Sequence, residues 1–167
     1  MIALIFPRPP FRIEIPSPSC YPISMSDSLT LLGNSQTSWP QSPDQAKLET
    51  FPNRSPQAHY WVHLDFPEFS SLCPVTGQPD TARIQIRYIP SETCIETKSL
   101  KFYLTSFRNH QAFNEEIVNR ILSDIVSAVN PREAVVRGDF SPRGGISLSA
   151  QASHPQAQWN GLSIDEK

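Results

Sequence analysis

The sequence predicts an α+β domain in which a four-stranded antiparallel sheet carries two helices on one face. Three observations support this fold class. Apolar and polar side chains alternate, as in half-buried strands, over 59–66 and 82–89. The pattern changes to a helical period between 98 and 129, and alternation returns from residue 134. The order strand-strand-helix-helix-strand-strand is typical of an α+β domain with its helices packed on one side of the sheet.

The first two predicted strands each have one apolar face. Over 59–66 this face consists of Tyr60, Val62, Leu64 and Phe66. Over 82–89 it consists of Ala82, Ile84, Ile86 and Tyr88. The stretch between the two strands is turn-like, so we expect an antiparallel pair. The preceding residues 29–58 are rich in Ser, Pro and Gln, which predicts an irregular arm with one helical turn near 45–48.

Two amphipathic helices are predicted next. The first covers roughly 98–108, where apolar residues recur at i, i+3, i+4 and i+7. The second starts near Asn114, with Glu115 and Glu116 placed where carboxylates favour the positive end of the helix dipole. Two further strands, at 134–140 and 146–150, are joined by a Gly-containing turn. The sheet has two open edges, and pairing with neighbouring subunits is one way to cover them, so we expect a homo-oligomer.

The two ends of the chain differ in composition from its middle. Residues 1–24 contain six prolines and are expected to form a disordered extension, with Met25 as the natural first residue. Residues 25–152 are expected to form one domain, and residues 153–167 a polar tail.

The composition argues against several classes of protein. A net charge of −2 gives no electrostatic footprint for nucleic acid or an anionic membrane, and no apolar run approaches the ~20 residues of a membrane helix. Cys20, Cys73 and Cys94 form no CxxC pair, which argues against a disulfide framework and a structural zinc site. We therefore expect a soluble cytoplasmic protein that binds neither a metal, nor nucleic acid directly, nor a membrane.

The stretch from Glu68 to Asp80 carries the clearest chemical signal. It contains a single cysteine, Cys73, and a carboxylate seven residues later, separated by two prolines and a glycine. An exposed thiol beside a rigid turn is a candidate nucleophile, and Asp80 is a candidate proton donor. Considered alone, the stretch is also consistent with a structural cysteine in a loop.

Two other groups of polar residues begin the predicted helices. Lys98, Ser99 and Lys101 lie at the start of the first helix, where free N–H groups and the dipole favour a phosphate. The alternative interpretation is that Lys98 and Lys101 are ordinary surface lysines at a solvated helix start. At the second helix, the Glu115 carboxylate can accept two parallel N–H bonds from a guanine-like edge, although a plain helix-terminal charge is the simpler interpretation of this residue alone.

Together these motifs resemble those of the NADPH-dependent 7-cyano-7-deazaguanine reductases, the QueF family of the unimodular type. The resemblance covers roughly 29–150. The matching motifs are LTLLGN at 29–34, FSSLCP at 69–74, TGQPD at 76–80, ETKSLKFY at 96–103, FRNH at 107–110 and RGGIS at 143–147. The Glu-[Ser/Thr]-Lys-Ser-x-Lys-x-Tyr stretch distinguishes this family from its relatives.

The resemblance implies a tunnelling fold (T-fold) and the reduction of a nitrile to a primary amine by two hydride transfers from NADPH. In this family the reaction is a step in the biosynthesis of queuosine, a modified tRNA nucleoside. By analogy, Cys73 adds to the nitrile carbon of 7-cyano-7-deazaguanine to give a covalent thioimide, and Asp80 protonates the nitrile nitrogen. Addition of a thiolate divides one difficult reduction into easier steps.

The resemblance also implies roles for other residues. Substrate contacts are expected from Ile95, Glu96, Thr97, Asn114 and Glu115. Contacts with the cofactor phosphates are expected from Lys98, Ser99, Lys101 and Arg143. The sequence has no Gly-x-Gly-x-x-Gly motif, so NADPH must bind outside a Rossmann domain. Family analogy also places the active sites between subunits of a homo-oligomer.

Two positions depart from the family pattern. Asn114 stands where members often have His, and Asn cannot titrate, which puts a proton-shuttle role at that position in doubt. Ile117 stands where some relatives have a second cysteine that pairs with the nucleophile, so that disulfide is expected to be absent. Two alternatives stay open: a GTP cyclohydrolase-like enzyme, which would need zinc held by Cys and His, and a non-catalytic purine- or pterin-binding module.

Overall fold

The computed structural model describes residues 29–31 and 38–156. The predicted extension over 1–24, the start at Met25, residues 32–34 of the first motif and the tail from 157 onward lie outside these residues. No helix in the described part of the chain is long and apolar enough to span a bilayer.

Four long strands form one antiparallel sheet in the order β2-β3-β5-β6. Their bounds are β2 (Val62–Leu72), β3 (Pro79–Ile89), β5 (Glu133–Arg143) and β6 (Ile146–His154). Each overlaps a predicted strand, and β2 and β3 extend far enough to leave only residues 73–78 as their connecting turn. Strand β6 includes Ser153 and His154, which the sequence had assigned to the polar tail.

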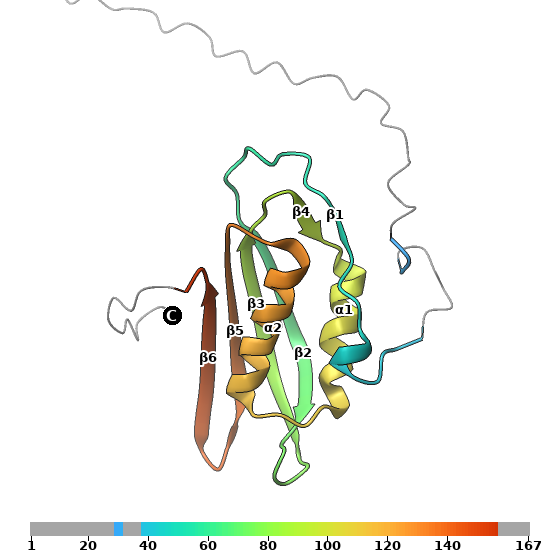
Figure 1. The fold of residues 1–167 in the computed structure, drawn as a ribbon. Coiled ribbons are helices and arrows are strands. Elements are labelled where there is room, and N and C mark those ends of the chain that lie inside the picture. Colours follow the sequence, from blue (N-terminus) through green and yellow to red (C-terminus); the bar gives the residue numbers. More distant parts are fainter. Residues whose placement is uncertain (1–28, 32–37, 157–167) are drawn as a thin grey trace, which may run out of the picture.

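Two helices lie between the strand pairs in sequence and cover one face of the sheet (Figure 1). They are α1 (Thr97–Thr105), which continues into the 3₁₀ turn η2 (Ser106–Asn109), and α2 (Asn114–Val129). The order β-β-α-α-β-β of the major elements therefore confirms the predicted fold class.

Three short elements complete the architecture. The 3₁₀ turn η1 (Pro43–Gln45) lies slightly before the helical turn predicted near 45–48. Strands β1 (Thr50–Pro52) and β4 (Thr93–Ile95) pair antiparallel as a separate two-stranded sheet. The sequence did not predict β1 and β4, because three residues are too few to show a period.

The core lies between the two helices and the sheet. The buried residues of α2 are Ile117, Val118, Ile121, Leu122, Ile125 and Val129. Each fully buried isoleucine contributes about 1.5–3 kcal/mol relative to an exposed one. A Cβ atom on Gly138 of β5 would lie 2.9 Å from Cγ2 of Val118 and 2.9 Å from Cε2 of Phe140. Glycine at this position therefore lets α2 pack directly against the sheet.

A β-bulge in β2 changes which side chains face the helices. The register of β2 against β3 shifts between Phe66 and Phe69. Before the bulge, Val62, Leu64 and Phe66 lie on the half-buried face, as predicted; after it, Phe69 and Ser71 are buried instead. Ser71 pairs in register with Asp80 of β3, so both residues lie at the same end of the sheet.

Candidate active site

Cys73 is the first residue of the turn between β2 and β3. Its N–H donates to the Gln78 carbonyl at 2.8 Å, and its carbonyl accepts from the Gly77 N–H at 2.9 Å. Gly77 has a φ of 68°, in the left-handed region that favours glycine. The Cys73 thiol is free and half-buried. Two backbone hydrogen bonds and a suitable glycine therefore fix the position of the candidate nucleophile.

Hydrogen bonds lower the pKa of the Cys73 thiol from its ordinary value of 9.0 to about 7. The side chain of Thr76 is the largest cause, followed by the backbone groups of Thr76 and Val75 and by the Arg143 guanidinium, whereas desolvation acts in the opposite direction. At pH 7 roughly half of the thiol is then ionised, against about 1% for an unperturbed thiol. The turn thus supplies a substantial population of the nucleophilic form at neutral pH.

Asp80 lies beside this turn on the inner face of the sheet. It is in phase with the buried residues Ala82 and Ile84 of β3, and only 7% of its surface is exposed. Its Oδ1 lies 2.5 Å from Nη2 of Arg143, and the same Nη2 donates to the Gln78 carbonyl at 3.2 Å. The ion pair compensates a carboxylate that would otherwise be costly to bury.

The start of α2 lies at the same end of the sheet as Cys73. The Leu72 N–H donates to the His110 carbonyl at 2.9 Å, and the Ala112 N–H donates to the Leu72 carbonyl at 3.3 Å. The segment that leads into α2 is therefore bonded to the residue directly before Cys73. Glu115 is exposed in the first turn of α2.

Two buried polar atoms at this end have no hydrogen-bond partner among the described residues. They are Oγ of Ser71, the cross-strand neighbour of Asp80, and Oδ1 of Asn114, the first residue of α2. Unsatisfied buried polar atoms are uncommon in folded proteins. Their presence near Cys73 and Asp80 is consistent with a polar ligand at this end of the sheet.

The other predicted substrate residues lie at the opposite end. The Ile95 N–H donates to the Tyr88 hydroxyl at 3.1 Å. Tyr88 is eight positions from Asp80 along β3, which corresponds to about 26 Å. Ile95, Glu96 and Thr97 help to line an apolar pocket of about 630 Å³ at this end. Within one chain, the structure therefore does not bring these residues together with Cys73, Asp80, Asn114 and Glu115.

The Glu96 carboxylate has a structural contact of its own. It accepts from the backbone N–H groups of Lys98 at 2.8 Å and Ser99 at 2.6 Å, which caps α1. The carboxylate is thus bound to the start of the helix.

The predicted cofactor residues are also spread out in one chain. Ser99 is fully buried, its hydroxyl donating to the Glu96 carbonyl at 2.7 Å and accepting from the Glu49 N–H at 2.9 Å. This arrangement supports a structural role for Ser99 rather than contact with a phosphate. The Lys98 ammonium donates to the Leu31 carbonyl at 2.5 Å, and the Lys101 ammonium lies 5.6 Å from the centroid of the Trp39 ring. Arg143 is at the other end of the sheet.

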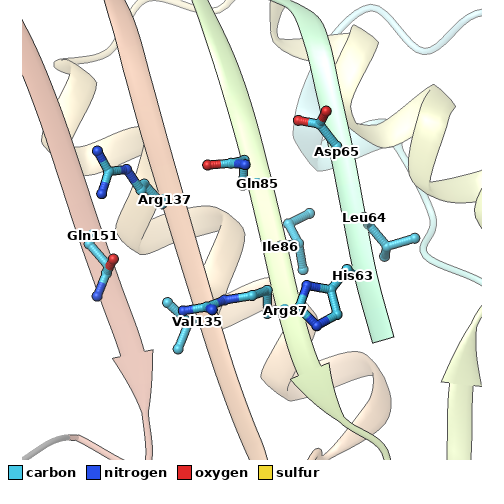
Figure 2. A pocket seen from close by; sticks show the side chains of 9 residues that line it. All are labelled: His63, Leu64, Asp65, Gln85, Ile86, Arg87, Val135, Arg137 and Gln151. Atoms are coloured by element: carbon cyan, nitrogen blue, oxygen red, sulfur yellow. The ribbon is translucent and has the colours of Figure 1, made fainter. Parts of the chain in front are cut away.

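A separate hollow of about 310 Å³ lies on the open face of the sheet (Figure 2). Its polar lining residues are His63, Asp65, Gln85, Arg87, Arg137 and Gln151. Ion pairs satisfy several charges on this face, including Arg83 with Asp65 at 2.7 Å and Arg137 with Asp139 at 2.9 Å. None of the site residues predicted from the sequence lines this hollow.

No group of three His, Cys, Asp or Glu side chains within residues 29–31 and 38–156 is arranged to hold a metal ion. The two described cysteines lie at opposite ends of the sheet. Cys94 is buried in β4, with its sulfur 3.7 Å from the Tyr60 hydroxyl. Ile117, at the position of the second cysteine of some relatives, is a fully buried core residue.

Comparisons with known proteins agree with the motifs found at both ends of the sheet. Residues 79–159 match the family described as "QueF-like protein". The NADPH-dependent 7-cyano-7-deazaguanine reductase of Bacteroides thetaiotaomicron is 49% identical over 130 residues, which are 78% of this chain and 85% of the relative. The chain belongs to this reductase family. The Porphyromonas gingivalis reductase is 52% identical over 72% of this chain and 77% of its own length.

Membership of the reductase family decides against the two alternatives that the sequence left open, a GTP cyclohydrolase-like enzyme and a non-catalytic purine- or pterin-binding module. The similar protein of Neisseria meningitidis serogroup B has the same description and is 47% identical over 77% of this chain and 82% of its own length. A crystal structure of the archaeosine synthase QueF-Like in the apo form is 24% identical. It superposes with a TM-score of 0.54 and covers 57% of this chain and 94% of that one. This similarity supports the fold, and the expected T-fold is confirmed.

The structure adds two residues that the sequence reasoning missed at the Cys73 end of this reductase: Thr76, whose hydrogen bonds lower the pKa of the Cys73 thiol, and Ser71, whose buried hydroxyl has no partner within the described residues. It also gives Arg143, which was expected to contact a cofactor phosphate, a contact with Asp80. The alternation of Ala82, Ile84 and Ile86 extends back to Asp80, so it already indicated that Asp80 points inward. The position of Arg143 depends on strand order, which the sequence pattern does not give.

Proposed function

We propose that this chain reduces the nitrile of 7-cyano-7-deazaguanine to a primary amine, giving 7-aminomethyl-7-deazaguanine with the consumption of two NADPH. This reaction is a step in queuosine biosynthesis. The observation that carries the proposal is a thiol with a lowered pKa in the turn that follows β2, together with a buried carboxylate at the adjoining end of β3. Reductases 47–52% identical to this chain carry this activity in their descriptions.

The first step is the addition of Cys73 to the nitrile. The S–H bond breaks, the proton passes to the Asp80 carboxylate, and a bond forms between sulfur and the nitrile carbon. Asp80 then delivers the proton to the nitrile nitrogen, so the C≡N bond becomes the C=N–H of a thioimide without any change in the number of electrons. One residue serves as base and then as acid, as general acid–base catalysis requires.

The remaining steps use the same two residues. NADPH, when bound, supplies the hydride for each of the two reductions. Cys73 stays bonded to the substrate carbon during the first reduction and then leaves as a thiolate, a departure that its lowered pKa favours. Asp80 is placed to return protons to the nitrogen. The cytoplasm is the compartment that we propose, because it keeps thiols such as Cys73 reduced.

The helix start beside Cys73 is suited to recognise the deazaguanine ring. We propose that the exposed Glu115 carboxylate accepts hydrogen bonds from the amino group and the ring N–H of the substrate. The buried Oδ1 of Asn114 has no partner in the described part of the chain, which supports a second polar contact with the substrate. An amide cannot titrate, so Asn114 is assigned to binding rather than to proton transfer.

The complete site is proposed to form between two subunits. Ile95 and Thr97 line a 630 Å³ pocket, a volume within the range of about 300–1,000 Å³ that is usual for small-molecule sites. This pocket is about 26 Å from Asp80 in the same chain. An interface that joins one end of the sheet to the opposite end of a neighbour would place the pocket against Cys73 and Glu115.

The same interface would bring the positive groups together. Lys98 and Lys101 of one subunit would then approach Arg143 of the next and could hold the NADPH phosphates, a set that no single chain provides. Within the described chain, the outer edges of β2 and β6 pair with no other strand. Leu72 of β2 is bonded to residues 110–112, so the edge of β6 and the rest of the β2 edge are available for subunit contacts.

The function is tested by adding 7-cyano-7-deazaguanine to the enzyme and following NADPH oxidation. Two NADPH are expected to be consumed for each amine formed, and mass spectrometry identifies the amine. The absence of turnover by a folded, reduced wild-type enzyme would contradict the proposal.

Subunit mixing tests where the site is built. Cys73→Ala removes the nucleophile, and Thr97→Trp places an indole in the pocket at a surface-exposed position. Each variant alone should be inactive, whereas co-expression should restore roughly a quarter of the wild-type activity, because random assembly leaves that fraction of interfaces with two intact halves. A mixture of Cys73→Ala with Asp80→Asn is the matched control. Both substitutions then affect the part of the site that contains Cys73, so no interface has an intact site and no recovery is expected. Equal recovery in the two mixtures would contradict a site shared between subunits.

A further inference from the structure

Arg143 contacts both parts of the candidate active site. Its Nη2 lies 2.5 Å from Oδ1 of Asp80 and 3.2 Å from the Gln78 carbonyl. That carbonyl also accepts the Cys73 N–H at 2.8 Å. A single guanidinium therefore links the buried carboxylate to the backbone that fixes the thiol.

The sheet explains why Arg143 reaches this place. It is the last residue of β5, next to the Gly144-Gly145 turn, in which both glycines have positive φ. Strand β5 lies beside β3, and the hydroxyl groups of Ser141 and Thr81 are 2.8 Å apart across the two strands. These contacts hold the end of β5 beside Asp80, so the ion pair follows from the strand order.

We propose that Arg143 is a positioning residue that holds the Asp80 carboxylate and the Cys73 turn in their reactive arrangement before substrate or cofactor binds. The inference deepens the proposed function, on which it rests. It assigns Arg143 a role in the covalent step, in addition to the phosphate contact expected from family resemblance.

The charges around Cys73 explain why such a residue is needed. The charged or titratable residues at this end include Asp80 on β3, Arg143 on β5, His110 in the segment bonded to β2, and Glu115 and Glu116 in the first turn of α2. A carboxylate beside a thiol opposes formation of the thiolate, because two negative charges repel. Arg143 offsets this repulsion, and its hydrogen bond contributes to the lowered pKa of Cys73. Without Arg143, Asp80 would also lose the contact that fixes its rotamer.

Thiol alkylation measures this role without substrate or NADPH. The rate of reaction of Cys73 with iodoacetamide is followed against pH in a Cys20→Ala/Cys94→Ala background, so that a single thiol reacts. In this background, the protein that retains Arg143 should show a midpoint of the alkylation rate near pH 7. Arg143→Met keeps the aliphatic stem but not the charge, and its midpoint should move to higher pH, with the rate at pH 7 roughly twofold to fivefold lower.

Two further variants separate charge from structure. Arg143→Lys keeps the positive charge and should restore much of the thiol reactivity. Arg83→Met is the matched control, because Arg83 also pairs with an aspartate, Asp65, but on the open face of the sheet; its midpoint should equal that of wild type. Circular dichroism confirms that each variant is folded. The Arg143 side chain is 40% exposed, so folding should tolerate its replacement.

The second readout is the rate of thioimide formation with 7-cyano-7-deazaguanine in the absence of NADPH, followed by intact mass. Arg143→Met should form the adduct roughly tenfold or more slowly than wild type, because the base and acid are no longer held in place. An unchanged alkylation midpoint together with an unchanged adduct rate, accompanied only by a higher KM for NADPH, would overturn the inference and leave Arg143 as a phosphate ligand alone. A wild-type enzyme that alkylates near pH 7 but forms no adduct would contradict the proposed function instead, and the alkylation profiles would still decide the effect of Arg143 on Cys73.

Discussion

Cys73→Ala is expected to abolish nitrile reduction, with a loss of at least about 10³-fold in kcat. A nitrile is a poor hydride acceptor until a nucleophile adds to its carbon, and alanine provides no group that can do so. The substitution is small and lies in a half-buried turn whose closing hydrogen bonds are made by the backbone, so the fold should be retained. NADPH oxidation and the intact mass of the protein after mixing with substrate are the two measurements.

The mass measurement locates the nucleophile. Wild type should gain the mass of one substrate per chain, and Cys73→Ala should gain none. Cys94→Ala retains Cys73 and should still gain the mass, since the Cys94 sulfur is buried against Tyr60 at the other end of the sheet. Equal labelling of wild type and Cys73→Ala would assign the covalent bond to another residue.

Asp80→Asn is expected to reduce kcat by about 10²-fold or more. The amide has nearly the shape of the carboxylate but cannot accept the thiol proton and pass it to the nitrogen. It also removes the charge that pairs with Arg143. Adduct formation without NADPH should be slowed, whereas alkylation with iodoacetamide should still detect a reactive Cys73 thiol. Stopped-flow or quenched mass measurements give the rate of the adduct step separately from turnover.

The control for this variant is Asp65→Asn. Asp65 also forms an ion pair with an arginine, Arg83, but it does so on the open face of the sheet. Its replacement should leave the adduct rate close to that of wild type. If Asp80→Asn turned over at the wild-type rate, Asp80 would have no part in proton transfer.

The fold could be predicted from the sequence because each major element has enough residues to show its period. The apolar residues of β3 and α2 appear at intervals of two and of three to four, and the structure buries those same residues. The small strands β1 and β4 are three residues long and gave no such signal. The bulge at Phe66–Phe69 was also missed, because the predicted alternation ended at Phe66 and did not follow β2 to Leu72.

The sequence suggests which residue types carry the chemistry of the candidate site, but it does not show how they assemble. Cys73, Asp80 and Glu115 are proposed from their residue types and from the family resemblance, because few side chains can act as nucleophile, acid or purine-binding carboxylate. Ser99 was included for its place at a helix start, yet its hydroxyl is used inside the protein. Which groups meet depends on strand order and register, and these result from long-range packing that local patterns do not encode.

The bulge in β2 has a consequence for how this reductase can vary. In a regular strand, alternation from Val62, Leu64 and Phe66 would direct residues 68, 70 and 72 toward the helices; the bulge directs 69 and 71 there instead. A strand of the same length without the bulge would pair residue 71 with residue 79, so Ser71 would no longer oppose Asp80 across the sheet. Deletion of one residue between Phe66 and Phe69 would instead remove the bulge and keep the pairs Phe69–Ala82 and Ser71–Asp80. A one-residue deletion in this short stretch should therefore be compatible with activity in members of the family, because it preserves the pairing of Ser71 with Asp80.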